Sequence, residues 1–166
     1  MAQAVEQGVQ SVSQMVTDAA FLDQAVEEVF GLMLGAAVTR VDGKVNIEPE
    51  CETLTAVIGL AGAISGACTI QAKAVSAMYM TSRMIGSEVH AIDDAVLDGL
   101  GEISNMLAGG WKSKMPPLNA ECLLSVPTVV TGTRYTVHRQ KPDFFVERHY
   151  MLDDHAFIVR VYGEIQ

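Results

Sequence analysis

The chain has 166 residues, a length typical of one domain that buries a core without disulfide or metal staples. Hydrophobic residues make up 49% and charged residues 19%, which argues against disorder, and no apolar run reaches the roughly 20 residues of a membrane-spanning helix. The net charge of −9 argues against nucleic acid or anionic lipid as a partner, because both are bound largely through Lys and Arg. The composition favours a soluble domain with a protein or cationic partner.

The first residues and the cysteines of the chain favour a cytoplasmic location for the protein. The first 20 residues lack the basic start, continuous apolar stretch and cleavage site of a signal peptide. The three cysteines, at positions 51, 68 and 122, form no disulfide framework. A single domain is expected over residues 1–166, and residues 1–16 could be a helical extension at its N-terminus.

The first predicted element is a helix over residues 17–35, with Thr17 or Asp18 as its N-cap and Gly35 as its stop. The β-branched content then rises, and "TAVIGLAGAISGACTIQA" predicts two strands joined by a tight turn at Ser65-Gly66. A phosphate-binding loop at its glycines is disfavoured, because no Gly-Lys-Ser/Thr follows and strands flank both sides. Next comes a short helix, "AVSAMYMTSRMIG", which Gly86 ends.

A third helix is predicted between Asp93 and Pro117, where Asp93 and Asp94 suit its N-terminus and Lys112 and Lys114 its C-terminus. The rest of the chain is rich in strand patterns. The four predicted strands are "ECLLSVPTVV", "RYTVHRQ", "DFFVERHYML" and "AFIVRVYGEI", separated by Gly132, Pro142 and a turn at Asp153-Asp154.

A repeat relates the first and third helices. At an offset of 75 residues, "LDQAVEEVFGLMLG" and "LDGLGEISNMLAGG" share their Leu, Asp, Glu and final Gly. Strands follow both helices, so the sequence predicts an α+β fold in which two helix-then-strands units share one antiparallel sheet, with the helices packed on it.

The third helix carries a polar stripe. At about 100° per residue, Asp98, Glu102 and Asn105 fall within about 60° of one another, opposite the apolar residues of the helix. Gly109 lies on the stripe, and Gly99 and Gly101 border it. Each interior glycine costs about 1 kcal/mol against alanine, and we interpret the three as bare surface on which another molecule docks. By geometry alone, an ordinary solvated helix face is the simpler interpretation.

The motif D-x-x-x-E-x-x-N at Asp98, Glu102 and Asn105, followed by Pro127 in "SVPTVVTG", resembles the signature of the CheC/CheX/FliY chemotaxis phosphatases. The likeness includes "VIGLAGAISG" and "SRMIG" and runs from about residue 20 to the end, with CheX as the most similar subgroup. It implies a CheC-like fold with exposed motif helices, and hydrolysis of the aspartyl phosphate of a CheY-like receiver domain.

The resemblance also assigns roles. Asn105 would orient the attacking water, and Glu102 would pair with a receiver lysine and fix the docking register. Asp98 would tune Glu102, contact the receiver or only order the helix, and Pro127 would shape the adjoining strand. The chain itself is expected to bind no cofactor or metal, because Mg²⁺ would belong to the receiver.

The first helix keeps Asp23 and Glu27 but has Phe30 in place of the asparagine and Leu34 in place of Gly109. An aromatic ring cannot orient water, so we interpret this helix as a degenerate second site. Phe30 and Leu34 are expected to be buried against the body of the protein or a partner chain. One active centre per chain follows, as in CheX.

Other functions are less well supported by the sequence. A metal site is disfavoured because the four histidines contain no i,i+4 pair. A cysteine nucleophile is disfavoured because the cysteines fall in or beside strand patterns, where buried thiols are usual. Trp111 and Phe144-Phe145 suit a core or an interface better than a base-stacking platform. The main alternative is a non-catalytic module that binds a receiver or the flagellar switch. The resemblance further implies a homodimer, for which the C-terminal strand could supply a pairing edge.

Overall fold

The computed structural model describes residues 12–166. Residues 12–17 are helical and end before Asp18, whose carboxylate caps the next helix by accepting a hydrogen bond from the Ala20 amide at 2.9 Å. The earlier part of the possible extension over residues 1–16 lies outside the described residues. Among the described helices, none is both long and apolar enough to cross a membrane.

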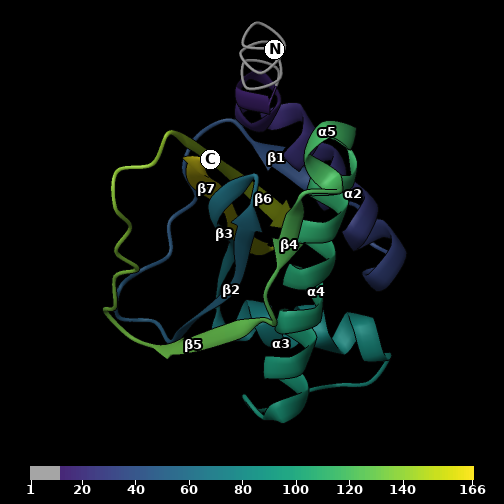
Figure 1. The fold of residues 1–166 in the computed structure, drawn as a ribbon. Coiled ribbons are helices and arrows are strands. Elements are labelled where there is room, and N and C mark those ends of the chain that lie inside the picture. Colours follow the sequence, from purple (N-terminus) through teal and green to yellow (C-terminus); the bar gives the residue numbers. More distant parts are fainter. Residues whose placement is uncertain (1–11) are drawn as a thin grey trace, which may run out of the picture.

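The elements follow the predicted order of helix, strands, two helices and strands (Figure 1). The helices are α2 (Ala19–Leu34), α3 (Ala74–Ile85), α4 (Asp94–Ser113) and the short α5 (Pro116–Asn119). The strands are β1 (Thr39–Val41), β2 (Thr53–Gly62), β3 (Ile64–Lys73), β4 (Cys122–Leu124), β5 (Thr128–Gly132), β6 (Phe144–Leu152) and β7 (His155–Ile165).

The strands form one antiparallel sheet in the order β1-β6-β7-β3-β2-β4, with β5 also paired to β2. This order divides between β7 and β3 into two halves with the same arrangement of strands. In this arrangement β2 of one half is equivalent to β6 of the other, and β3 is equivalent to β7. The first strands are exchanged, because β1 pairs with β6 of the second half and β4 and β5 pair with β2 of the first. The predicted α+β fold of two helix-and-strands units is confirmed.

The hairpin between β2 and β3 turns at Gly62, earlier in the chain than the sequence predicted. Gly62 has a φ of 110°, a conformation that side-chain-bearing residues rarely adopt. Ser65 and Gly66 instead lie inside β3, and a Cβ on Gly66 would come within 2.0 Å of the Tyr162 carbonyl oxygen on β7. The prediction of a turn at Ser65-Gly66 is therefore wrong: Gly66 permits close strand contact.

Helices α2, α3 and α4 cover one face of the sheet, and two long loops run on the other side (Figure 1). The loop over residues 133–143 contains the whole of the predicted strand "RYTVHRQ", which is not a strand in the structure. It crosses the sheet face, where the Tyr135 hydroxyl lies 2.6 Å from Thr55 Oγ1. The segment is therefore attached to β2 through a side-chain contact, and it does not form the strand that its alternating apolar and polar residues predicted.

The C-terminal strand β7 lies in the middle of the sheet, paired with β3 on one side and β6 on the other. The expectation that "AFIVRVYGEI" supplies an edge for pairing with a second copy is therefore wrong, because both of its edges are already used. The edges of the sheet are β1 at one end and β4 with β5 at the other.

Candidate functional site on α4

Helix α4 is fixed at both ends and along its buried face. Asp93 caps its start by accepting a hydrogen bond from the Val96 amide, and Lys112 near its end donates to the backbone carbonyls of Asn119 and Cys122. The face toward the sheet is fully buried through Val96, Leu100, Ile103 and Leu107. These contacts hold the opposite face of the helix in a fixed orientation.

That opposite face carries the polar stripe. Asp98 and Glu102 are exposed and Asn105 is half-buried. Among residues 12–166, none of these three side chains has a hydrogen bond or an ion pair with another residue. The prediction that the stripe points away from the core is confirmed, and its polar groups are available to another molecule.

Two of the three glycines expected on the docking surface are covered by the protein itself. A Cβ on Gly99 would lie 2.9 Å from Met84 Cε and 3.1 Å from Thr81 Oγ1, both on α3. A Cβ on Gly101 would lie 3.3 Å from the Pro127 ring. The interpretation of Gly99 and Gly101 as docking surface is therefore wrong, because they let α3 and the segment before β5 pack closely on α4.

Gly109 is open, since the nearest atom to a methyl group added there would be Leu124 Cδ1 at 4.0 Å. It lines an open groove of about 450 Å³ between α2 and α4, which also includes Asn105. Leu32 on α2 lines the same groove with 78% of its surface exposed. The other lining residues are Glu28, Val29, Met106, Gly110, Ser113 and Leu124.

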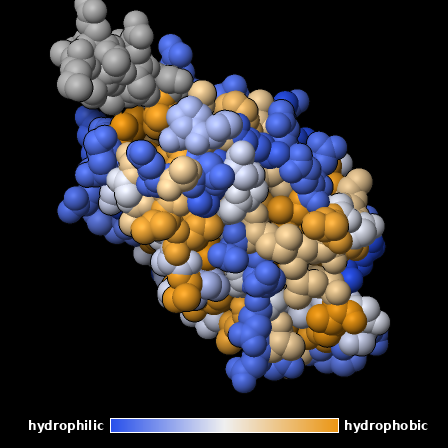
Figure 2. Space-filling view, turned by 45° about the vertical axis from the view of Figure 1, so that its right-hand side comes forward, coloured by the Kyte–Doolittle hydropathy of each residue, from blue (hydrophilic) through white to orange (hydrophobic). Residues whose placement is uncertain are grey.

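The groove gives the stripe an apolar flank. On the side of the molecule that Figure 2 brings forward, hydrophobic and hydrophilic areas lie next to one another. Gly110 faces α2, where an added Cβ would lie at an ordinary contact distance of 3.7 Å from the Ala25 methyl carbon. Across the groove, Lys114 donates to both carboxylate oxygens of Glu28 at 2.8 Å. The arrangement joins exposed polar groups to an apolar hollow on one surface.

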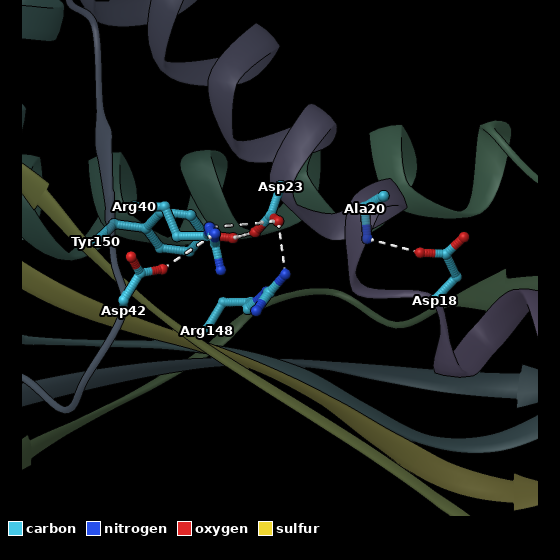
Figure 3. Close-up of polar contacts among 7 residues, drawn as sticks. All are labelled: Asp18, Ala20, Asp23, Arg40, Asp42, Arg148 and Tyr150. Carbon is cyan, nitrogen blue, oxygen red and sulfur yellow. Dashed lines mark hydrogen bonds and ion pairs between the residues drawn. The ribbon is translucent and has the colours of Figure 1, made fainter.

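The corresponding aspartate on α2 is already occupied by the sheet. Asp23 accepts hydrogen bonds from the Tyr150 hydroxyl at 2.7 Å and from Arg148 at 2.9 Å, and Arg40 lies 4.0 Å away (Figure 3). Burial, together with the hydrogen bond to Asp23, raises the pKa of Tyr150 well above its ordinary value. Asp23 therefore anchors α2 to β6 and is not free for a partner.

Phe30 and Leu34, at the positions equivalent to Asn105 and Gly109, lie in the core. Phe30 is fully buried and stacks on Phe157 of β7 with ring centroids 4.7 Å apart. Glu27 remains exposed. The expected burial of Phe30 and Leu34 against the body of the protein is confirmed.

A family model described as chemotaxis phosphatase CheX matches residues 54–148, more than half of the chain. The chain belongs to the CheX family. The matched region contains Asp98, Glu102, Asn105 and Pro127, whereas the degenerate positions on α2 lie outside it. The CheY-P phosphatase CheX of Thermotoga maritima is 27% identical over 113 residues, which cover 60% of this chain and 73% of that protein.

Solved structures share the CheX fold. CheX in the CheX-CheY-BeF3-Mg complex from Borrelia burgdorferi is similar with a TM-score of 0.71 and 16% identity, over 87% of this chain and 96% of that one. CheX from Vibrio vulnificus has a TM-score of 0.72 and 19% identity, over 86% and 93% of the two chains. FliY of Thermotoga maritima has a TM-score of 0.62 and 14% identity, over 94% and 90%.

Other chemical groups of this CheX-family chain are poorly placed for catalysis. All three cysteines are free, and burial raises the pKa of the Cys68 thiol to about 12 and also raises that of Cys122. Within residues 12–166, no group of three or more His, Cys, Asp or Glu residues gathers in a way that could hold a metal ion. The stripe on α4 remains the strongest candidate.

Sequence reasoning missed the groove. Two sequence features could have indicated it. One is Leu32, a large apolar residue on the exposed side of α2, and the other is the pair of glycines Gly109-Gly110 on α4. The packing of α2 beside α4 decides whether these residues meet, and that contact is not encoded in the period of either helix.

Proposed function

We propose that this protein stimulates hydrolysis of the aspartyl phosphate of a CheY-like receiver domain. Membership of the CheX family supports the reaction class, as do the relative named CheY-P phosphatase and the fold shared with a CheX bound to CheY. The observation that carries the proposal is the position of Glu102 and Asn105 one turn apart on an exposed helix face, without partners among the described residues.

Asn105 is the proposed catalytic residue. Its carboxamide has both a donor and an acceptor, so it can hold a water molecule in line with the phosphorus atom. The water oxygen forms a bond to phosphorus while the bond from phosphorus to the aspartyl oxygen breaks, which releases phosphate and restores the receiver carboxylate. An acyl phosphate is already activated, so orientation of the water is the main task left to the helper protein.

Glu102 is proposed to pair with a receiver lysine and fix the register of docking. Residues three apart on a helix have Cβ atoms roughly 5–6 Å apart, so Glu102 can contact the lysine while Asn105 reaches the water. Asp98 lies one turn before Glu102 and has no assigned contact to the reacting atoms. The receiver would supply Mg²⁺, which offsets the negative charge of the phosphoryl group.

The groove between α2 and α4 is the proposed docking surface for an apolar side chain of the receiver. It adjoins Asn105, and its exposed Leu32 offers apolar area that binding would remove from water. Gly109 keeps this approach open, and it is the one predicted docking glycine that the structure leaves uncovered.

The test is phosphate release from a panel of phosphorylated receivers of the host, with and without the protein. Faster release from at least one receiver is expected. Asn105→Ala should lower stimulated turnover about 100-fold and leave binding to a beryllofluoride-bound receiver nearly unchanged. Glu102→Ala should also weaken binding, most strongly at low salt. Binding to a receiver without acceleration would identify the non-catalytic adaptor instead.

A matched pair of variants tests the groove. Leu32→Ser should raise the KM for the phosphorylated receiver and leave turnover at saturation nearly unchanged. Val75→Ser on α3 removes an exposed valine that does not line the groove, so it should have no effect. Equal effects of the two substitutions would remove the groove from the proposal.

A homodimer stays a prediction. Because β7 is central, a pairing edge would have to come from β1 or from β4 and β5. Light scattering at micromolar concentration measures the oligomeric state, and a monomer would contradict the prediction.

A further inference from the structure

A polar hollow of about 280 Å³ lies on the face of the sheet opposite α4. Its floor is made by side chains of β2, β3, β6 and β7, and its roof is the loop over residues 133–143. This loop is tied to the other long loop, because the Arg134 amide donates to the Pro49 carbonyl oxygen at 3.0 Å. The lining residues are Thr55, Thr69, Gln71, Tyr135, Thr136, Val137, Arg139, Glu147, Arg160 and Tyr162.

The acidic group in the hollow is already neutralised. One Glu147 oxygen accepts from Arg160 Nε at 2.7 Å, and the other lies 2.9 Å from His149 Nε2. His149 Nδ1 accepts from the Val45 amide, so the neutral imidazole carries its proton on Nε2 and donates it to Glu147. Burial alone would raise the pKa of Glu147, but the hydrogen bonds from His149 and Arg160 hold it below its ordinary value.

The hollow also contains two arginines, which can only donate hydrogen bonds. Arg160 also donates to Gln71 through Nη1 at 2.8 Å, and within residues 12–166 no hydrogen bond engages its Nη2. The Arg139 guanidinium lies 3.9 Å from the centre of the Phe145 ring and 5.6 Å from that of Tyr162, and no acidic group of the described chain pairs with it. The aromatic rings hold the flat guanidinium and leave its N–H edge free.

The charge of the hollow is opposite to that of the chain. Two arginines and one glutamate give its lining a formal charge of +1, while the whole protein carries −9. We propose that the hollow binds a small organic anion that carries a carboxylate or phosphate group, held by the free N–H edge of Arg139 and by Nη2 of Arg160. A planar guanidinium matches both groups through paired hydrogen bonds. The site is separate from the α4 stripe and does not depend on the phosphatase proposal.

Calorimetric titration of the whole protein with succinate, glycerol 3-phosphate and inorganic phosphate tests the inference. At low ionic strength, at least one probe should bind with a dissociation constant of about 1 mM or tighter. Tighter binding of succinate would identify a carboxylate ligand, and tighter binding of either phosphate compound a phosphorylated one. Absence of binding by all three would overturn the proposal.

Variants locate the binding. Arg139→Gln should weaken it about tenfold, because a charge-assisted hydrogen bond is lost while no ion pair of the described chain is broken. Lys141→Gln removes the same charge from the same loop outside the hollow and should leave the affinity unchanged. Backbone amide NMR shifts should concentrate at residues 135–139. Equal weakening by both variants, or shifts away from this loop, would mean that the anions bind only to general positive charge.

Discussion

Helices α2 and α4 contain the same Asp-x-x-x-Glu spacing, yet the sheet uses them in opposite ways. On α2, Asp23 is held by Arg148 and Tyr150, and Phe30 is stacked in the core. On α4, Asp98 is exposed and Asn105 is accessible beside a groove. The comparison teaches that motif spacing defines a site only when the strands beneath the helix leave its polar groups without partners.

The largest effect is expected from an attempt to convert α2 into a second site. Phe30→Asn should cost about 4 kcal/mol of folding free energy, because it removes a fully buried ring and buries an amide in its place. It should not raise turnover per chain, since Leu34 is buried and Asp23 remains bonded to the sheet. Denaturant unfolding and phosphate release measure the two outcomes, and a doubled turnover would contradict this interpretation of α2.

The next largest effect is the difference in stability between substitutions of the two equivalent aspartates, Asp23 on α2 and Asp98 on α4. Asp23→Ala leaves Arg148 and the Tyr150 hydroxyl without their partner and should cost about 2 kcal/mol, a value reduced because the pair is partly exposed to solvent. Asp98→Ala should change stability by less than about 0.5 kcal/mol. Urea midpoints of the two variants measure this contrast. Similar losses would show that Asp98 is also a structural residue.

Alkaline pH should sharpen the comparison. Tyr150 keeps its proton in the folded protein above its ordinary pKa of 10.0, whereas the unfolded chain loses that proton. The contribution of Tyr150 to stability is therefore complete below pH 10 and falls by about 1.4 kcal/mol per pH unit above it. Tyr150→Phe should flatten this part of the dependence of unfolding free energy on pH. An unchanged slope would mean that Tyr150 does not control it.

The smallest effect concerns the glycines of α4. Gly109→Ala should stabilise the protein by about 0.8 kcal/mol, because the added methyl group meets open space and alanine favours the helix. Gly101→Ala should lose that gain, since its methyl group would press on Pro127. Thermal unfolding of both variants measures the difference in stability. Equal stabilisation would show that Pro127 moves aside without loss of folding free energy.

The α4 stripe could be predicted because it depends on one helical period and local caps: Val96 and Leu100 fix the buried face, and Asp93 fixes the start. The errors all involve contacts between distant segments. Gly66 faces Tyr162 of β7, and Gly99 faces α3, so both glycines serve packing that no local pattern contains. Tyr135 likewise uses its hydroxyl to contact Thr55 across the sheet face, in a loop that resembles a strand.

The exchange of first strands between the two halves has a consequence for how the chain folds. Val41 of β1 pairs with His149 of β6, so the N-terminal half cannot pair its first strand until β6, which belongs to the other half, is in place. Thr55 on β2 similarly pairs with Val130 on β5, which comes from the second half of the chain. Pairings between such distant residues slow folding, because loop-closure entropy is lost before the contacts form. Neither half can complete its own sheet, and we therefore expect the two repeats to fold together in a single cooperative transition.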